Sequence, residues 1–283
     1  MKVTVLVDNT ALYDRMFVAE HGFSAYIEAG KTKILFDTGY SGVVLNNAAK
    51  MNIDLLDLDY IVLSHGHFDH TGGLWHLIQR YRDAEIEGLP HRTPTLIAHP
   101  HCFLPRSKKP GTDNGTLLTA DAVQRIFPVE PATKPFRLAP GLHFLGEIER
   151  TCAFETFDPG SRRIVLPDGT IEPDIIRDDT SLAFRGQDGL VVISGCAHAG
   201  ICNTIEYAKK VCNENRIQDI IGGLHLIKPG HQLDGTVAYL RSTQPAALHA
   251  CHCTSLAAKL ALAGAAPLQE CGVGLRLLYD PAG

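Results

Sequence analysis

The sequence predicts an α/β fold in which helices cover layered β-sheets. Short apolar runs with the length of buried strands alternate with longer amphipathic runs that have the spacing of helices. The string His65-Gly66-His67-Phe68-Asp69-His70 directly follows one of the apolar runs, Tyr60-Ile61-Val62-Leu63. The length of 283 residues and the hydrophobic content of 45% suit a globular core.

The expected strands are short and aliphatic: Val3–Val7, Ser24–Glu28, Lys33–Phe36, Tyr60–Leu63, Thr95–Ala98, Leu182–Phe184, Leu190–Ser194, Ile217–Ile221 and Ala246–Cys251. The expected helices are Gly42–Met51, Leu74–Tyr81, Ile201–Val211, Thr236–Ser242 and Ser255–Ala263. The proline-rich stretch 99–180 breaks this alternation. We expect it to be an elaborated connection of hairpins and loops inside a single domain of residues 1–283. Loops on a rigid scaffold commonly carry substrate specificity.

Composition excludes several classes of function. The net charge of −5 gives no general affinity for polyanions, so we expect no nucleic-acid partner. No apolar run approaches the roughly 18 residues of a membrane helix, so we expect no membrane partner. The N-terminal run Met1–Val7 has the pattern of a strand, not of a signal peptide, and we expect a cytoplasmic protein with reduced cysteines. The sequence predicts no particular oligomeric state.

The histidine-rich string has the chemistry of a metal site. It places three imidazoles and a carboxylate at the end of a predicted buried strand, followed by Thr71-Gly72-Gly73-Leu74, which looks like a turn into a helix. Histidine and aspartate are costly to bury without compensation, and a divalent cation compensates all of them at once. A hydrogen-bonded surface histidine remains the alternative for any one of them.

The string resembles the His-x-His-x-Asp-His signature of the metallo-β-lactamase superfamily, and further motifs extend the resemblance along most of the chain. They are Phe36-Asp37-Thr38-Gly39, Ser194-Gly195-Cys196-Ala197-His198 and Leu248-His249-Ala250-Cys251-His252-Cys253-Thr254. Asp178-Asp179-Thr180 and Ile221-Gly222-Gly223-Leu224-His225-Leu226 are similar to a subgroup labelled dihydropterin-ribofuranosylaminobenzene-phosphate synthases. The resemblance implies an αββα sandwich of two face-to-face mixed sheets, with metals at one edge.

The resemblance also implies two divalent ions per chain, zinc first, with manganese or iron as alternatives. His65, His67 and His198 would bind one ion, and Asp69, His70 and His252 the other. The residues support this division, because His198 and His252 each follow an apolar run and can stand at strand ends on one edge. Gly195 would let the backbone turn before His198.

His252 competes with its neighbours for the role of ligand. On an extended strand His249, Cys251 and Cys253 share one face and His252 the other, so we favour His252 and expect buried thiols at the cysteines. We expect Asp37 to accept an imidazole N–H and fix the ring's orientation, with an Asx-turn as the alternative.

The chain departs from the superfamily at one point. Most dinuclear members have a bridging aspartate between the third and last motifs, where this chain has only Asp219, inside a predicted strand, and Asp234, in a predicted loop. The expected position holds Gly222-Gly223-Leu224-His225 instead. His225 could be a ligand, a proton donor or a group behind the ligands, or a histidine that caps a loop.

We expect a metal-dependent enzyme of hydrolase type that acts on a small anionic, phosphorylated substrate. Bound metal lowers the pKa of water toward ~7, and Asp69 would orient the nucleophile or carry its proton. The subgroup's label implies a condensation of a dihydropterin diphosphate with a ribofuranosylaminobenzene phosphate instead. Arg106, Lys108 and Lys109 are candidates for phosphate binding, or a solvated basic loop.

Other functions on the same fold stay open. An iron-dependent redox enzyme is one, although the flavin-associated di-iron members usually have glutamate where His67 stands. A non-catalytic ligand-binding module is another. The acidic balance argues against a nuclease.

Overall fold

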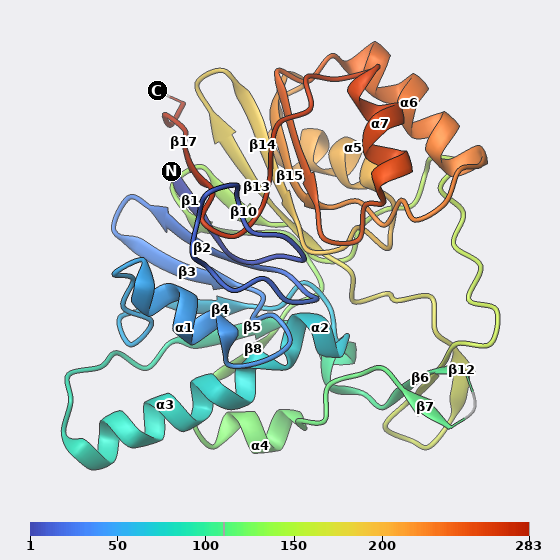
Figure 1. Ribbon diagram of the computed structural model, residues 1–283. Coiled ribbons are helices and arrows are strands. Elements are labelled where there is room, and N and C mark those ends of the chain that lie inside the picture. The colour runs from blue at the N-terminus through green and yellow to red at the C-terminus, as the bar shows by residue number, and fades with distance from the viewer. Residues whose placement is uncertain (110, 283) are drawn as a thin grey trace.

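The computed structural model describes residues 1–109 and 111–282, and in these residues two large β-sheets pack face to face between outer helices (Figure 1). The first sheet has the strand order β17 (Arg276–Leu278), β1 (Lys2–Val7), β2 (Ser24–Ala29), β3 (Thr32–Phe36), β4 (Tyr60–Val62), β5 (Thr95–Ala98) and β8 (Val129–Pro131). The second has the order β16 (Ala247–Cys251), β15 (Ile217–Gly223), β14 (Gly189–Ser194), β13 (Ser181–Gly186), β10 (Leu142–Phe144) and β9 (Phe136–Ala139).

The core between the sheets follows from the alternation of side chains along each strand. In β3, Ile34 and Phe36 face the central core, together with Val191 and Ile193 of β14. Leu35 of β3 faces the opposite side, into a second core under the outer helices. Both faces of these strands are therefore buried, which explains their nearly continuous apolar sequences.

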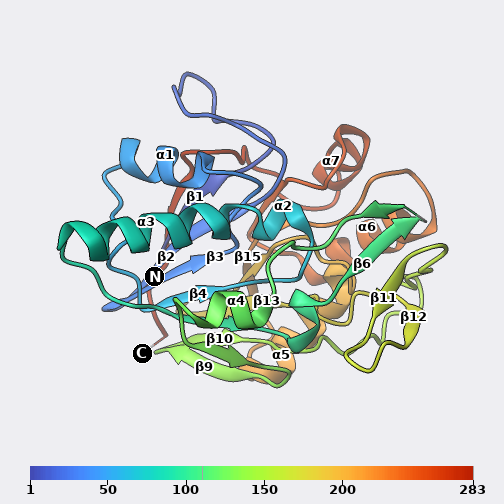
Figure 2. The same ribbon diagram turned by 90° about the horizontal axis from the view of Figure 1, so that it is seen from below.

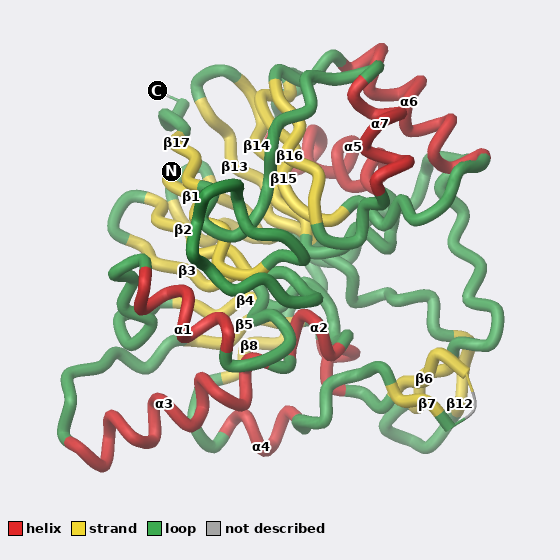
Figure 3. The backbone as a smooth tube through the Cα atoms, viewed as in Figure 1, coloured by secondary structure: helices red, strands yellow, loops and turns green. Residues whose placement is uncertain are grey.

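Helices cover the two outer faces, as Figure 3 shows. On the first sheet lie α1 (Val43–Lys50), α3 (Gly73–Glu87) and the short α4 (Ala120–Gln124). On the second lie α5 (Ile201–Cys212), α6 (His231–Thr243) and α7 (Leu256–Ala263). The predicted αββα sandwich is thus confirmed. Each helix and strand expected from the sequence exists, with bounds that differ by up to six residues, the most at the end of α3.

The proline-rich stretch contains more regular structure than expected. It holds η1 (Pro100–Phe103), α4, β8, β9, β10 and a small separate sheet of β12 (Ile171–Pro173), β11 (Arg163–Val165), β6 (Arg106–Lys109) and β7 (Thr112–Asp113). Figure 2 shows β6, β11 and β12 at one side of the molecule, apart from the two large sheets. The stretch therefore adds strands to both halves as well as connecting them.

Parallel pairing determines where the site forms. In the first sheet β3, β4, β5 and β8 run parallel, and in the second β14, β15 and β16 do. The carboxyl ends of parallel strands meet at one sheet edge, where ligands bind in α/β folds. The chain leaves β4 directly before the histidine-rich string, whose end forms the one-turn helix α2 (Phe68–Thr71).

Candidate metal centre

Sharp backbone turns follow several of these strand ends. Asp37, Ala197, His225 and His252 have φ angles of 57°, 52°, 50° and 46°, in the left-handed region that non-glycine residues rarely adopt. Each such residue costs about 1–3 kcal/mol, and such conformations tend to gather at functional sites. Three of the four residues are candidates from the sequence, and the fourth precedes His198.

The first group of imidazoles comes from both halves of the molecule. His65 Nε2 lies 2.9 Å from His67 Nδ1. The His198 ring centroid lies 4.8 Å from those of both His65 and His67. Among the described residues, His67 Nε2 and both nitrogens of His198 are buried without a hydrogen-bond partner.

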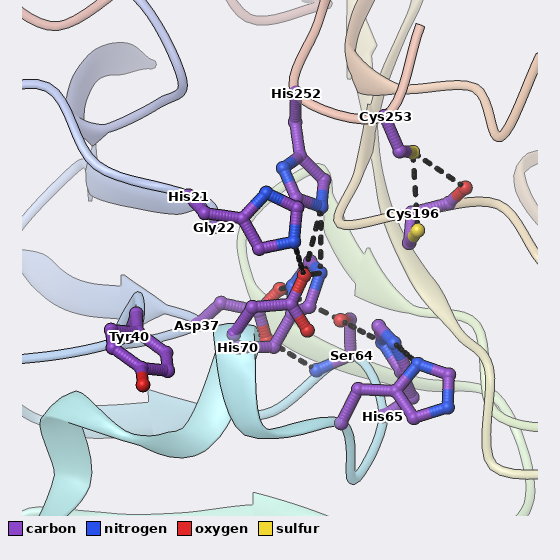
Figure 4. A network of polar contacts seen from close by, with 12 residues as sticks. His21, Gly22, Asp37, Tyr40, Ser64, His65, His70, Cys196, His252 and Cys253 are labelled. Carbon is purple, nitrogen blue, oxygen red and sulfur yellow. Dashed lines mark hydrogen bonds and ion pairs between the residues drawn. The ribbon is translucent and has the colours of Figure 1, made fainter. Parts of the chain in front are cut away.

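The second group combines the end of the string with the end of β16. His70 Nε2 lies 3.2 Å from His252 Nε2, and Figure 4 shows the two side chains pointing toward each other. Asp69 Oδ2 is 3.5 Å from His252 Nε2 and 3.9 Å from His70 Nε2. The structure thus brings together the six residues that the sequence nominates as ligands, in two neighbouring groups.

Asp37 orients two imidazoles of the string, His70 directly and His65 through Ser64. His70 Nδ1 lies 2.7 Å from Asp37 Oδ2, and Ser64 donates its hydroxyl to the same oxygen. His65 Nδ1 contacts the Ser64 oxygen at 2.9 Å. Because these outer nitrogens face acceptors, each carries a proton, and the Nε2 atoms of His65 and His70 point into the site.

His252 is oriented in the same way by the loop after β1. Its backbone N–H donates to Asp8 Oδ1 at 2.7 Å, and its Nδ1 lies 3.0 Å from the side-chain oxygen of Asn9. The Nδ1 proton therefore points at Asn9, which leaves Nε2 without a proton on the side of His70 and Asp69.

Electrostatics fit a bound cation. Burial, aided by the nearby Arg106 charge, lowers the pKa of His67 to about 3. Burial and the neighbouring imidazoles hold the pKa values of His65 and His198 well below the usual range. These rings are therefore neutral, and His65 Nε2 and His67 Nδ1 converge to 2.9 Å. Neutral imidazole nitrogens that converge in this way have the chemistry that a divalent metal site needs.

The pKa of His70 also fits a bound cation, although it is shifted up and not down. Burial disfavours its charged form, but the Asp37 and Asp69 carboxylates outweigh burial and raise the pKa of His70 to about 9. Burial likewise acts to raise the pKa of Asp69, but His70 and a hydrogen bond from His21 hold it well below its usual range. The second group therefore attracts positive charge, and a divalent ion would replace the proton.

Gly195 has a different role from the expected one. Its own backbone is ordinary, and Ala197 makes the sharp turn. A Cβ atom at Gly195 would lie 2.3 Å from Ser64 Oγ and 2.5 Å from Asp37 Oδ2. Glycine is required here because the loop of the second sheet passes against the residues that orient His65 and His70.

The expectation that Cys253 lies on the same face of an extended strand as His249 and Cys251 is wrong. The strand ends at Cys251, and the left-handed turn at His252 reverses the next side chain. Cys251 is buried in the core as expected, whereas Cys253 is half-buried with its Sγ 3.1 Å from Cys196 Sγ (Figure 4). His249 contacts Asp219 in the core and faces away from the ligands.

Cys196, Cys253 and His225 form a further cluster beside the imidazoles. Cys196 Sγ lies 3.4 Å from His225 Nδ1. The backbone N–H of His225 donates to Cys253 Sγ at 3.1 Å. The His225 ring centroid is 4.1 Å from that of His198. Thus His225 lies next to the first group.

His21 is a polar neighbour of Asp69 that the sequence does not indicate. Its Nε2 lies 3.0 Å from Asp69 Oδ2, and its side chain is 60% exposed. It is a single histidine in the loop before β2, with no motif around it, so only the tertiary structure reveals its position.

The expectation that Arg106 binds a phosphate of the substrate is wrong, because its side chain is not accessible to a substrate. Its side chain is fully buried, with Nη2 2.9 Å from Asp178 Oδ2 and Nη1 3.5 Å from Asp174 Oδ2. The partners lie about seventy residues later, which hides the pairing in the sequence. Lys108 and Lys109 are exposed on β6.

An open cavity of about 620 Å³ adjoins α2. Its walls include Tyr40, Phe68 and Trp75 from one side and Thr116 and Leu118 from the other. The rings of Tyr40 and Phe68 meet edge to face with centroids 5.4 Å apart. Since Phe68 directly precedes Asp69 on the same short helix, the aromatic wall of the cavity and the ligand groups share one element.

Comparison with known proteins gives one family. The profile of the metallo-beta-lactamase superfamily matches residues 18–209. A curated relative from Methanocaldococcus jannaschii, named 7,8-dihydropterin-6-methyl-4-(beta-D-ribofuranosyl)-aminobenzene-5'-phosphate synthase, is 32% identical over 274 residues, which is 92% of this chain and 89% of the relative. An uncharacterised protein of the same organism is 31% identical over 260 residues, 90% of this chain and 91% of that protein.

Solved structures that resemble this chain belong to the same superfamily or share its fold. A crystal structure described as a metal-dependent hydrolase of the β-lactamase superfamily has a TM-score of 0.82 and 26% identity, over 99% of this chain and 100% of that one. A Bacillus subtilis protein of the metallo-beta-lactamase fold, at 12% identity and a TM-score of 0.56 over 98% of this chain and 99% of that one, shares the fold. Separately, none of the helices in the described residues is long and apolar enough to cross a bilayer.

Proposed function

Because this chain belongs to the metallo-β-lactamase superfamily, whose members bind divalent metal, we propose that it is an enzyme that uses two divalent ions to act on a small anionic substrate carrying an aromatic ring. The observation that carries the proposal is the convergence of buried imidazole nitrogens and Asp69 in two adjacent groups. His65, His67 and His198 would hold one ion, and Asp69, His70 and His252 the other. We take zinc as the first candidate, with manganese or iron as alternatives.

Bound ions of this kind act as Lewis acids toward anionic oxygen and lower the pKa of water to about 7. The chain's own residues then position and carry protons. Asp69 lies at the edge of the second group with one oxygen toward His21, and it can orient an attacking group or accept its proton. His225 lies half-buried beside the first group and is the candidate proton donor to a leaving group.

The cavity beside α2 supports a substrate with a planar ring. A volume of about 620 Å³ is within the usual range of small-molecule sites. Tyr40, Phe68 and Trp75 offer aromatic surfaces on which such a ring can stack. A ring held there would extend from the ligand groups, with its anionic group on the ions. Lys108 and Lys109 are the candidates for a second contact with phosphate.

The relative from M. jannaschii suggests the first substrates to try, a dihydropterin diphosphate and a ribofuranosylaminobenzene phosphate, whose condensation releases diphosphate. Hydrolysis of a phosphoester, thioester or lactone is the second candidate, favoured by the hydrolase at a TM-score of 0.82. The same set of ligands would serve both reactions, because each would need bound cations to stabilise anionic oxygen.

The test combines elemental analysis of the purified chain with a substrate panel. We expect about two divalent ions per chain and turnover of at least one phosphorylated aromatic compound, abolished by chelator and by His67→Ala. Iron with a visible absorption band would instead favour a redox enzyme. Bound metal without turnover of any panel member would favour a binding module.

A further inference from the structure

We propose that the Cys196 sulfur is a metal ligand shared by the two ion positions, in place of the bridging carboxylate that the chain lacks. This inference rests on the proposed metal-dependent function and adds a ligand to it. Cys196 lies in the turn after β14, two residues before His198.

The geometry places Cys196 between the two groups. Its Sγ lies within 4.8 Å of one nitrogen each of His65 and His198, which belong to the first group. It also lies within 4.8 Å of one nitrogen each of His70 and His252, which belong to the second. A bridging ligand must reach both ions, and ions that share a ligand stand about 3.5–4 Å apart. Cys196 meets this requirement from the protein side.

Among the residues that the structure describes, no carboxylate between the third and last motifs lies between the two groups of candidate ligands. Asp219 is buried inside β15, where it accepts one hydrogen bond from the Tyr279 hydroxyl at 2.6 Å and contacts His249 Nδ1 at 2.9 Å. Asp234 lies in the first turn of α6 and is exposed. Asp69 touches the second group alone. A shared ligand must therefore come from another residue type.

The surroundings of Cys196 suit a coordinating sulfur. The residue is buried, and Cys253 Sγ and His225 Nδ1 lie 3.1 Å and 3.4 Å from its Sγ. Groups of this kind behind a ligand fix its direction and tune the metal. On binding, the metal displaces the thiol proton, which leaves to solvent, and a metal–sulfur bond forms without any oxidation or reduction.

A sulfur ligand changes which metal the site prefers. Thiolate and imidazole donors favour zinc and iron, whereas manganese and magnesium prefer all-oxygen sets. The proposal therefore narrows the metal to zinc or iron.

Cobalt(II) provides the test, because a cobalt–thiolate bond gives an intense charge-transfer band in the near ultraviolet and imidazole or carboxylate ligands do not. The full chain, freed of metal and kept reduced under anaerobic conditions, is titrated with cobalt. We expect binding of about two ions and a thiolate band that Cys196→Ser removes, together with at least about tenfold weaker cobalt binding.

Two further variants identify the sulfur. Cys212→Ser is the matched control, because Cys212 is also buried with its Sγ 3.6 Å from a histidine nitrogen, that of His143, but belongs to none of the candidate groups. It should keep the band, and so should Cys253→Ser. Cys196→Asp restores a carboxylate and should bind two ions without the band.

The outcomes separate this inference from the proposed function. Two bound cobalt ions without a thiolate band would overturn the sulfur ligand and leave the metal enzyme standing. A band lost in Cys253→Ser but kept in Cys196→Asp would also overturn it. A chain that binds no cobalt would overturn both. If Cys196→Ser fails to fold, the wild-type band and its persistence in Cys253→Ser still decide.

Discussion

At the scale of single residues, the site depends on where each imidazole proton lies. Asp37 is fully buried and receives Ser64 N–H at 2.7 Å, the Ser64 hydroxyl and His70 Nδ1. One carboxylate thus sets the tautomers of two rings, because His65 is reached through Ser64. Its left-handed backbone at the end of β3 points the side chain under the string.

Asp37→Asn should therefore weaken metal binding by about 10–100-fold, the usual effect of losing a group that orients a ligand. The amide keeps the size of the carboxylate but loses its charge and offers N–H where an acceptor is needed. Zinc affinity measured with a competing chelator is the readout. Asp54→Asn is the control, because Asp54 accepts the Leu56 N–H at 2.9 Å on an exposed turn. Equal zinc affinity in both variants would contradict this role of Asp37.

At the scale of elements, the segment before β13 ties the two halves together under the site. Asp178 accepts the Gly66 N–H at 2.8 Å, and the Thr180 N–H donates to the Ser64 carbonyl at 2.9 Å. Asp179 accepts the Ala199 N–H at 2.9 Å. Three consecutive residues therefore hold the loop after β4 and the loop after β14, which carry the first group of imidazoles.

Arg106 anchors this segment from β6, and Arg106→Met should destabilise the fold by about 3–5 kcal/mol, because it leaves Asp178 buried without its partner. Denaturant unfolding of the metal-free chain measures the effect. Lys108→Met on the same strand is exposed and should change stability by less than about 0.5 kcal/mol. A near-neutral Arg106→Met would show that the ion pair is dispensable.

The start of α3 and α2 form the aromatic wall of the cavity, which leads to a prediction about substrate affinity. Trp75→Ala should raise KM about 2–10-fold for a ring-bearing substrate and leave kcat nearly unchanged, because aromatic contacts are worth about 0.5–1.5 kcal/mol beyond their area. Ile86→Ala, at the far end of α3 and 81% exposed, is the control. An unchanged KM, or an equal loss with a substrate that lacks the ring, would remove the cavity from the proposal.

The sequence predicts those parts of the structure that depend on interactions between residues close together in the chain. Strands and helices agree well because apolar spacing is local, and the nominated ligands lie together because each follows a strand end. The sequence does not indicate that Arg106 is buried, because its acidic partners come from a distant loop. The positions of Cys253 and His21 depend on a left-handed turn and on a loop contact, neither of which has a sequence pattern.

At the scale of the whole molecule, the site is a junction between the two sheets. His65, His67 and His70 come from the loop after β4 of the first sheet, and His198 and His252 from the ends of β14 and β16 of the second. The central core already joins the sheets through apolar packing. Bound ions would add a polar link at one edge, where neutral imidazoles from the two halves otherwise face one another.

Metal loading should therefore stabilise the whole fold. A free zinc concentration of 100 times Kd adds about 2.7 kcal/mol to the free energy of unfolding, reduced by whatever zinc the unfolded cysteines and histidines bind. For a chain of this size that corresponds to a rise in Tm of several degrees. Thermal unfolding with zinc and with chelator measures it, and magnesium should have little effect because it prefers oxygen ligands. The double variant His67→Ala/His252→Ala removes one ligand from each group and should lose most of the zinc-dependent rise. An equal rise in that variant would mean that zinc stabilises the chain from somewhere other than the junction of the sheets.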